Sequence, residues 1–138
     1  DYILKSINHT VYDDSLTITP NDFNLKRWAN QGILLLNTAL TTELNKVGTH
    51  FEVWKPFIDY LFKRLSESNY GLIVLFLGTR AKEFNGYFNS NLFYKLYASH
   101  PASAAYNNFN YWECNDCFNE INNILLSNNN NKIQHLPI

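Results

Sequence analysis

The feature that most constrains the fold is a run of apolar residues at positions 33–36, which lies between two turn signals. Gly32 precedes the run, and Asn37 ends it. A short apolar run bounded in this way is typical of a strand buried on both faces, and such strands belong to parallel sheets covered by helices. The run therefore predicts an α/β fold, with Asn37 at the carboxyl end of its first strand.

Asn37 is a candidate ligand-binding residue, because ligands of open parallel sheets bind outside the carboxyl ends of the strands. Its amide offers an acceptor oxygen and two donor hydrogens in one plane, which suits the edge of a planar heterocycle. The alternative is that Asn37 only terminates the strand, since asparagine is common in turns. The residues of this stretch leave both interpretations open.

Helices and strands alternate along the rest of the chain. Helices are predicted at residues 1–14, 20–28, 50–66, 80–84 and 115–126, and strands at residues 33–36, 72–77 and 93–98. Thr49 is the predicted N-cap of the third helix, whose regular part is expected to begin near Pro56. This order predicts an α/β fold in three layers, with a parallel sheet flanked by helices. At 138 residues the chain is one domain at most, and 46% hydrophobic residues exclude a disordered protein.

The charge and the cysteines narrow the classes of partner. A formal net charge of -1 is a poor fit to a protein that grips DNA through many phosphates, so amides and hydroxyls would carry more of such a contact. No apolar run approaches the ~20 residues of a membrane span. The start at Asp1 has no signal-peptide pattern, and the sequence therefore predicts an intracellular protein, in the cytoplasm or nucleus, without a membrane partner. Cys114 and Cys117 form one pair without a second pair, so no metal or cofactor is predicted.

The two later strands also end in residues that could carry chemistry. Gly78 and Thr79 follow the second strand, and their spacing favours a plain strand-to-helix turn over a phosphate-binding turn. His100 follows the third strand, and Pro101 holds it extended. A lone histidine is more often structural, but the His-Pro pair at a strand end leaves the structural and catalytic interpretations about level. In a parallel sheet the ends of all three strands would meet in one crevice.

Four stretches of the sequence resemble family 1 uracil-DNA glycosylases. WANQGILLLNTALT at residues 28–41 resembles the family segment WA-x-QG-[VI]-LLLN-x-x-LT. IVLFLGTRA at residues 73–81 is similar to the family strand that ends in Gly-Ser, and SHPASAAY at residues 99–106 resembles the loop His-Pro-Ser-x-x-Ser-x-Tyr. FNEINNIL at residues 118–125 is similar to the last family helix. The resemblance covers nearly all of this chain but only the C-terminal two thirds of the family domain.

The resemblance implies a role for each candidate residue. Asn37 would hydrogen-bond the edge of a uracil flipped out of DNA. His100 would donate from a neutral ring to uracil O2 as negative charge builds on the leaving base. DNA phosphates would be held by Gly78, Thr79 and Ser103, and a minor-groove loop would be formed by Pro101, Ala102, Ala104 and Tyr106.

The chain departs from the family pattern at two places. The loop after His100 is one residue shorter and lacks the leucine that wedges into the base stack, so that Ala104 and Ala105 are expected at its tip. The motif Gly-Gln-Asp-Pro-Tyr-His, whose aspartate positions water, does not occur in the sequence. In the family, the strand of that motif lies between the first two strands found here. Residues 1–138 are therefore expected to form a glycosylase-like domain without its N-terminal part. Either a longer polypeptide carries the motif upstream, or another segment fills the gap in the sheet.

The function that the resemblance implies is base-excision repair by hydrolysis of the N-glycosidic bond of uracil, without a metal. The expected partners are uracil-containing DNA and a protein inhibitor or similar protein, and the expected state is a monomer. The retained Asn37 and His100 favour the enzyme. The missing aspartate, the acidic charge and the lost wedge favour the alternative, a catalytically silent module that binds DNA or protein. An unrelated small α/β domain is a third and weaker hypothesis.

Overall fold

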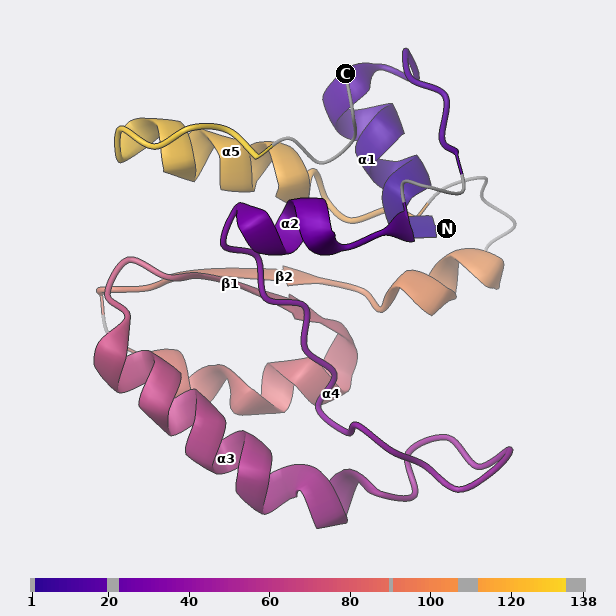
Figure 1. The fold of residues 1–138 in the computed structure, drawn as a ribbon, viewed down its shortest axis with the longest axis vertical. Helices are drawn as coiled ribbons and strands as arrows, with labels where there is room; N and C mark the ends of the chain where they lie inside the picture. Colours follow the sequence, from indigo (N-terminus) through magenta and orange to yellow (C-terminus); the bar gives the residue numbers. More distant parts are fainter. Residues whose placement is uncertain (1, 20–22, 90, 107–111, 134–138) are drawn as a thin grey trace. The chain divides into compact units, whose positions relative to one another are not determined.

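The computed structural model describes residues 2–19, 23–89, 91–106 and 112–133, and the chain divides into two compact units. We call Asp1–Leu34 with Ala98–Ile138 the terminal unit, and Leu35–Tyr97 the central unit. The elements are, in order, α1 (Tyr2–Tyr12), α2 (Lys26–Asn30), α3 (Phe51–Ser68), β1 (Ile73–Leu77), α4 (Gly78–Lys82), the 3₁₀ helix η2 (Glu83–Phe88), β2 (Tyr94–Ala98), the 3₁₀ helix η3 (Pro101–Ala105) and α5 (Cys117–Ser127), as Figure 1 shows. A single domain at residues 1–138 stays a prediction.

The terminal unit is built around α1, which follows the predicted helical spacing. Leu4 and Ile7 are buried on one face of α1, and the helix ends where Asp13 and Asp14 adopt positive φ angles of 51° and 57°. The side chain of Asn119 on α5 donates a hydrogen bond of 2.7 Å to the carbonyl of Thr10. The hydrophobic side chains buried in this unit are Leu4, Ile7, Trp28, Ala104, Trp112, Cys114, Cys117 and Phe118.

The core of the central unit is a chain of aromatic contacts from α3 to the sheet. Phe62 on α3 meets the rings of Phe84 and Phe88 on η2 at centroid distances of 5.1 and 5.9 Å. Phe88 in turn meets Phe76 on β1 at 6.2 Å. Figure 1 accordingly shows η2 between α3 and the two strands. Edge-to-face aromatic pairs add to the free energy gained by burying apolar area, so these rings fix the layers of this unit.

The sheet of the described residues has two strands, β1 and β2, and they run parallel. The amide of Gly71 donates to the carbonyl of Leu92, and the amide of Tyr94 donates to the carbonyl of Leu72. Both bonds advance in the same direction along the two segments, as a parallel ladder requires. The predicted α/β class and its parallel sheet are therefore confirmed, with α4 and η2 in the crossover.

The predicted strand at residues 33–36 is wrong. The segment joins no ladder in the described part of the chain, and its backbone bond is from the amide of Ile33 to the carbonyl of Trp28. Leu34 and Leu35 are 63% and 46% exposed, so the run is not buried on both faces. Apolar residues become a buried strand only beside other strands, and in the described part of the chain the sheet contains only β1 and β2.

Smaller differences concern the helix boundaries. α3 begins at Phe51, before Pro56, and His50 rather than Thr49 holds the N-cap position. The Thr49 hydroxyl instead accepts a bond from the amide of Glu43 within the preceding loop. The predicted start of the second helix, at residues 20–22, lies outside the described residues. No helix in the described part of the chain is long and apolar enough to cross a membrane.

Candidate functional site

His100 leaves the end of β2 with an extended backbone, as the proline after it requires. Its φ and ψ angles are -70° and 137°, and Pro101 begins η3 immediately afterwards. The residue before a proline avoids the helical region because of steric clash with the proline ring. The strand end and the proline together therefore place the histidine at a sharp and defined change of direction.

The imidazole of His100 is held by a backbone donor. The amide of Ala102 donates to Nδ1 of His100 at 3.2 Å, and the histidine side chain is otherwise exposed. Because Nδ1 accepts this bond, the neutral ring carries its proton on Nε2. The histidine therefore presents an N–H donor at the tip of its ring, which is the group that the resemblance requires.

The loop that carries His100 is tied together and anchored to the core of the terminal unit. The amide of Ser103 donates to the carbonyl of His100 at 2.8 Å. The Ser99 and Ser103 hydroxyls lie 3.2 Å apart, and Nε1 of the buried Trp112 donates to the Ser99 hydroxyl at 2.9 Å. The sequence argument missed Ser99 and Trp112. The available signal was a tryptophan, whose indole N–H needs a partner once it is buried.

The other residues of this loop face in different directions. Ala104 is only 2% exposed, so its side chain packs inward, and the expectation that it occupies the loop tip is wrong. Tyr106 is 88% exposed at the end of the same turn. The loop therefore offers Tyr106, rather than Ala104, to a binding partner.

Asn37 lies in the central unit, one residue after the extended run that replaces the predicted strand. The residue is exposed, and no hydrogen bond joins its amide to another residue in the described part of the chain. Its acceptor and donors can therefore bind a ligand without breaking a bond within this region.

Gly78 and Thr79 stand at the junction of β1 and α4, as predicted. Gly78 has a φ angle of 86°, a conformation that glycine adopts without the steric penalty of other residues. Thr79 follows with an exposed side chain. Its successor Arg80 lies with its guanidinium 4.6 Å from the ring centre of Phe51 and 3.5 Å from a carboxylate oxygen of Glu83.

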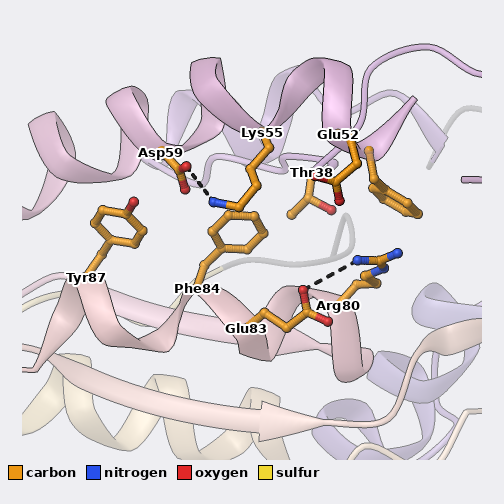
Figure 2. A pocket seen from close by; sticks show the side chains of 9 residues that line it. Thr38, Glu52, Lys55, Asp59, Arg80, Glu83, Phe84 and Tyr87 are labelled. Carbon is orange, nitrogen blue, oxygen red and sulfur yellow. Dashed lines mark hydrogen bonds and ion pairs between the residues drawn. The ribbon is translucent and has the colours of Figure 1, made fainter. Parts of the chain in front are cut away.

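A small cleft in the central unit joins the segments that carry Asn37 and Thr79. Thr38 and Arg80, the residues that follow these two, both line it. Figure 2 shows its charged groups, with Lys55 and Asp59 facing each other at 2.6 Å. The cleft encloses about 140 Å³, which is well below the ~300–1,000 Å³ of ligand pockets. Residues next to Asn37 and Thr79 thus line the same cleft, but the cleft is too small to hold a nucleotide.

Two ion pairs line the cleft, Lys55 with Asp59 and Arg80 with Glu83. The hydrogen bond to Lys55 lowers the pKa of the Asp59 carboxyl and raises the pKa of the Lys55 ammonium. The Asp59 carboxylate also raises the pKa of the facing Tyr87 phenol. At neutral pH the lysine and the aspartate therefore stay charged, and the phenol stays protonated.

The cysteine pair belongs to the core of the terminal unit. Cys114 and Cys117 are free thiols and are buried, and the Ser6 hydroxyl donates to Sγ of Cys114 at 3.6 Å. Hydrogen bonding from the Cys117 thiol lowers the pKa of Cys114 to about 6, and the same interaction raises the pKa of Cys117. Within the described residues, no group of three or more His, Cys, Asp or Glu side chains could hold a metal ion.

The candidate residues fall into two groups. Asn37, Gly78 and Thr79 lie in the central unit. The terminal unit holds the loop residues His100, Pro101, Ala102, Ser103, Ala104 and Tyr106. The structure thus gathers the second group in one turn, whereas of the first group only the neighbouring residues Thr38 and Arg80 line a common cleft.

Comparison with known proteins identifies several relatives, although no family model matches the chain. The chain is 32% identical over 108 residues to a uracil-DNA glycosylase of Phocaeicola vulgatus, an alignment that covers 77% of this chain and 49% of the relative. It is 32% identical over 123 residues to a uracil-DNA glycosylase of Fusobacterium nucleatum, covering 88% of this chain and 54% of the relative. The chain thus spans about half the length of the curated relatives it matches.

A solved structure with the same fold is a mimivirus UNG variant in complex with UGI. The two structures superpose with a TM-score of 0.76 at 25% sequence identity. The match covers 96% of this chain and 55% of the viral protein. Nearly the whole chain therefore matches a little over half of a known structure.

Proposed function

The chain belongs to the uracil-DNA glycosylase family, and from this premise we propose that it binds a uracil flipped out of DNA and promotes hydrolysis of its N-glycosidic bond. A base must leave the helical stack before an enzyme can act on it. The proposed activity belongs to base-excision repair, and the proposed partner is uracil-containing DNA. The activity is proposed for the protein as its gene encodes it, and not for residues 1–138 in isolation.

The observation that carries the proposal is the hydrogen bond from the amide of Ala102 to Nδ1 of His100. It leaves Nε2–H as the donor of the neutral ring. As the glycosidic bond breaks, negative charge develops on uracil O2, and a donor already in place stabilises that charge more strongly than water does. One such donor contributes roughly 3–4 kcal/mol to the stability of a transition state.

Asn37 is the proposed reader of the base. Its amide can donate to uracil O4 and accept from uracil N3–H, which matches the edge of the base. Its exposure and the lack of an amide hydrogen bond in the described region support this role. Gly78, Thr79 and Ser103 are the proposed phosphate contacts, through amides and hydroxyls. Such neutral donors suit a chain whose net charge is only -1.

Four further features belong to the proposal. We assign no residue of this chain to water activation, since the aspartate motif of the family is not among the 138 residues. The minor-groove loop consists of Pro101, Ala102 and the exposed Tyr106, with Ala104 as internal support. The proposed protein partner is an inhibitor, because the two mimivirus UNG variants were solved in complex with UGI. The protein acts as a monomer inside the cell.

A glycosylase-like module without catalysis is the competing function. Two observations favour it, namely the absent aspartate motif and the net charge of -1. This module would bind DNA or another protein through the same surface and release no base. The two functions therefore differ in one product, free uracil.

The test uses the protein as its gene encodes it and two labelled oligonucleotides that differ only in a central uracil or thymine. We expect alkali-sensitive cleavage of the uracil strand in a single turnover, and none of the thymine strand. Retained DNA binding without cleavage of either strand would assign the protein to the competing function.

A further inference from the structure

We propose that Ser99 and Trp112 are positioning residues that hold the His100 ring in the orientation in which it acts. This inference rests on the proposed function, because it assigns to them a task in the same reaction. Both residues lie in the terminal unit with His100. Neither touches the base in this proposal, and both act through the loop.

Trp112 provides the rigid end of this arrangement. Its side chain is fully buried, and its ring meets Phe118 of α5 edge to face at a centroid distance of 6.2 Å and an interplanar angle of 78°. A side chain packed in this way has little freedom to rotate. The indole N–H must find an acceptor in this buried position, and Ser99 supplies it at 2.9 Å.

Ser99 passes this restraint on to the loop. A hydroxyl both accepts and donates, so Ser99 can accept from Trp112 while it bonds the hydroxyl of Ser103, 3.2 Å away. Ser103 is also tied to His100 through its backbone amide, at 2.8 Å from the His100 carbonyl. The histidine thus lies between two serines that are joined to each other and anchored to a buried ring.

The consequence concerns the direction of the Nε2–H bond. The ring is oriented by the bond between the Ala102 amide and Nδ1 of His100, and that amide belongs to the same anchored turn. A displacement of about 1 Å of a catalytic group can lower a rate by roughly 100-fold. Loss of the anchor should therefore reduce the chemical step while DNA binding, which depends mainly on the phosphates, stays unchanged.

The kinetic test compares Ser99→Ala, Trp112→Phe and the double variant with the parent protein as its gene encodes it. In single-turnover uracil release, we expect each variant to be slower by roughly 10- to 100-fold, with the same DNA affinity as the parent. The double variant should be no slower than the single variants, because both changes break the same bond. Ser99→Thr keeps the hydroxyl and should restore most of the rate.

Stability separates positioning from a structural role. Ser99→Ala leaves a buried N–H donor without a partner, whereas the double variant removes donor and acceptor together. Urea unfolding should therefore show that the double variant loses less stability than the sum of the losses of the two single variants, while its rate stays low. Ser127→Ala, which removes a serine hydroxyl from the end of α5 in the same unit, is the matched control and should keep the parental rate. A rate that recovers together with stability, or single variants as fast as the parent, would overturn the proposal.

A measurement that needs no activity keeps this inference separate from the proposed function. Long-range ¹H–¹⁵N NMR reports which ring nitrogen of His100 carries the proton. We expect the Nε2–H form in the parent and a mixture of both forms in Ser99→Ala and Trp112→Phe. An unchanged spectrum would refute the positioning role even if the parent releases uracil. The expected mixture would support it even if the parent releases none.

Discussion

The two segments that carry Asn37 and His100 are built in opposite ways. The segment before Asn37 has no regular secondary structure, and its leucines have no ladder partner among the described residues. The loop around His100 is closed by hydrogen bonds among Ser99, Ala102 and Ser103, and Trp112 anchors it. The loop around His100 is thus held by its own contacts, whereas the segment before Asn37 pairs with no strand in the described part of the chain.

The difference shows which structure a short stretch of chain can specify alone. All bonds that fix the His100 loop form within a stretch whose most distant partners, Ser99 and Trp112, are 13 residues apart. A buried strand, in contrast, needs adjacent strands to pair its amides and carbonyls, and unpaired buried groups are costly. Local contacts therefore preorganise the proposed leaving-group donor, whereas the segment of the proposed base-binding amide has no such local contacts in the described part of the chain.

The largest expected effect on the rate comes from a substitution in the segment that carries Asn37. We expect Asn37→Asp to slow single-turnover uracil release by roughly 10³-fold or more, because a carboxylate cannot donate to uracil O4 and a site built on hydrogen bonds rejects a mismatched partner strongly. The stability of the protein should hardly change, since no described hydrogen bond of the amide is lost. Asn91→Asp adds the same charge to an exposed turn of the central unit and is the control. Parental activity in Asn37→Asp would leave Asn37 as a residue that only ends a segment.

The turn at Gly78 extends the comparison between the Asn37 segment and the His100 loop. It lies in the same unit as Asn37, but its conformation depends on the positive φ angle of its own glycine. We expect Gly78→Ala to destabilise the protein by about 1–2 kcal/mol, since alanine is strained at the positive φ of this position. Urea unfolding measures the change. Gly86→Ala is the matched control, since no heavy atom lies within 4 Å of the added methyl group and the backbone there is unstrained. Equal stability of the two variants would show that the turn is not fixed by its glycine.

The smallest expected effect concerns Tyr106, the exposed end of the closed loop. Tyr106→Ala should weaken binding to uracil-containing duplex DNA by a few-fold, because an exposed aromatic ring that stacks on a base contributes about 1 kcal/mol. The free energy of unfolding should be unchanged, since the exposed side chain of Tyr106 is not part of the core. Fluorescence anisotropy titrations of the two proteins provide the measurement. Equal affinities would remove Tyr106 from the DNA surface.

The sequence predicted the elements whose signals are local. The spacing of apolar residues predicted α1, α3 and α5, and turn residues such as Gly71 and Gly78 marked the limits of β1. The prediction of a strand at residues 33–36 was wrong, because apolar composition indicates burial but does not show whether partner strands are present. The α/β class was nevertheless predictable, since β1, α4, η2 and β2 form a parallel crossover within one stretch.

How much of the candidate site the sequence could predict differed from residue to residue. Pro101 alone predicted the extended backbone of His100, whose angles agree. Asn37 and His100 entered as candidates through strand ends, and their roles came from the resemblance. The anchor formed by Ser99 and Trp112 was missed, because a tryptophan indicates only that its indole N–H needs a partner once buried, and not that the partner is a serine 13 residues away. The inward packing of Ala104 was missed because burial in a loop depends on tertiary contacts that leave no periodic pattern.

The most direct test of the account is the rate of uracil release by His100→Ala, measured in a single turnover beside a DNA titration of the same protein. We expect the rate to fall by on the order of 10²–10³-fold, because the donor to the leaving base is lost. DNA affinity should stay nearly constant, since phosphate contacts dominate binding. His9→Ala removes an exposed histidine from the same unit and should match the parent. A His100→Ala rate equal to that of the parent would contradict the account.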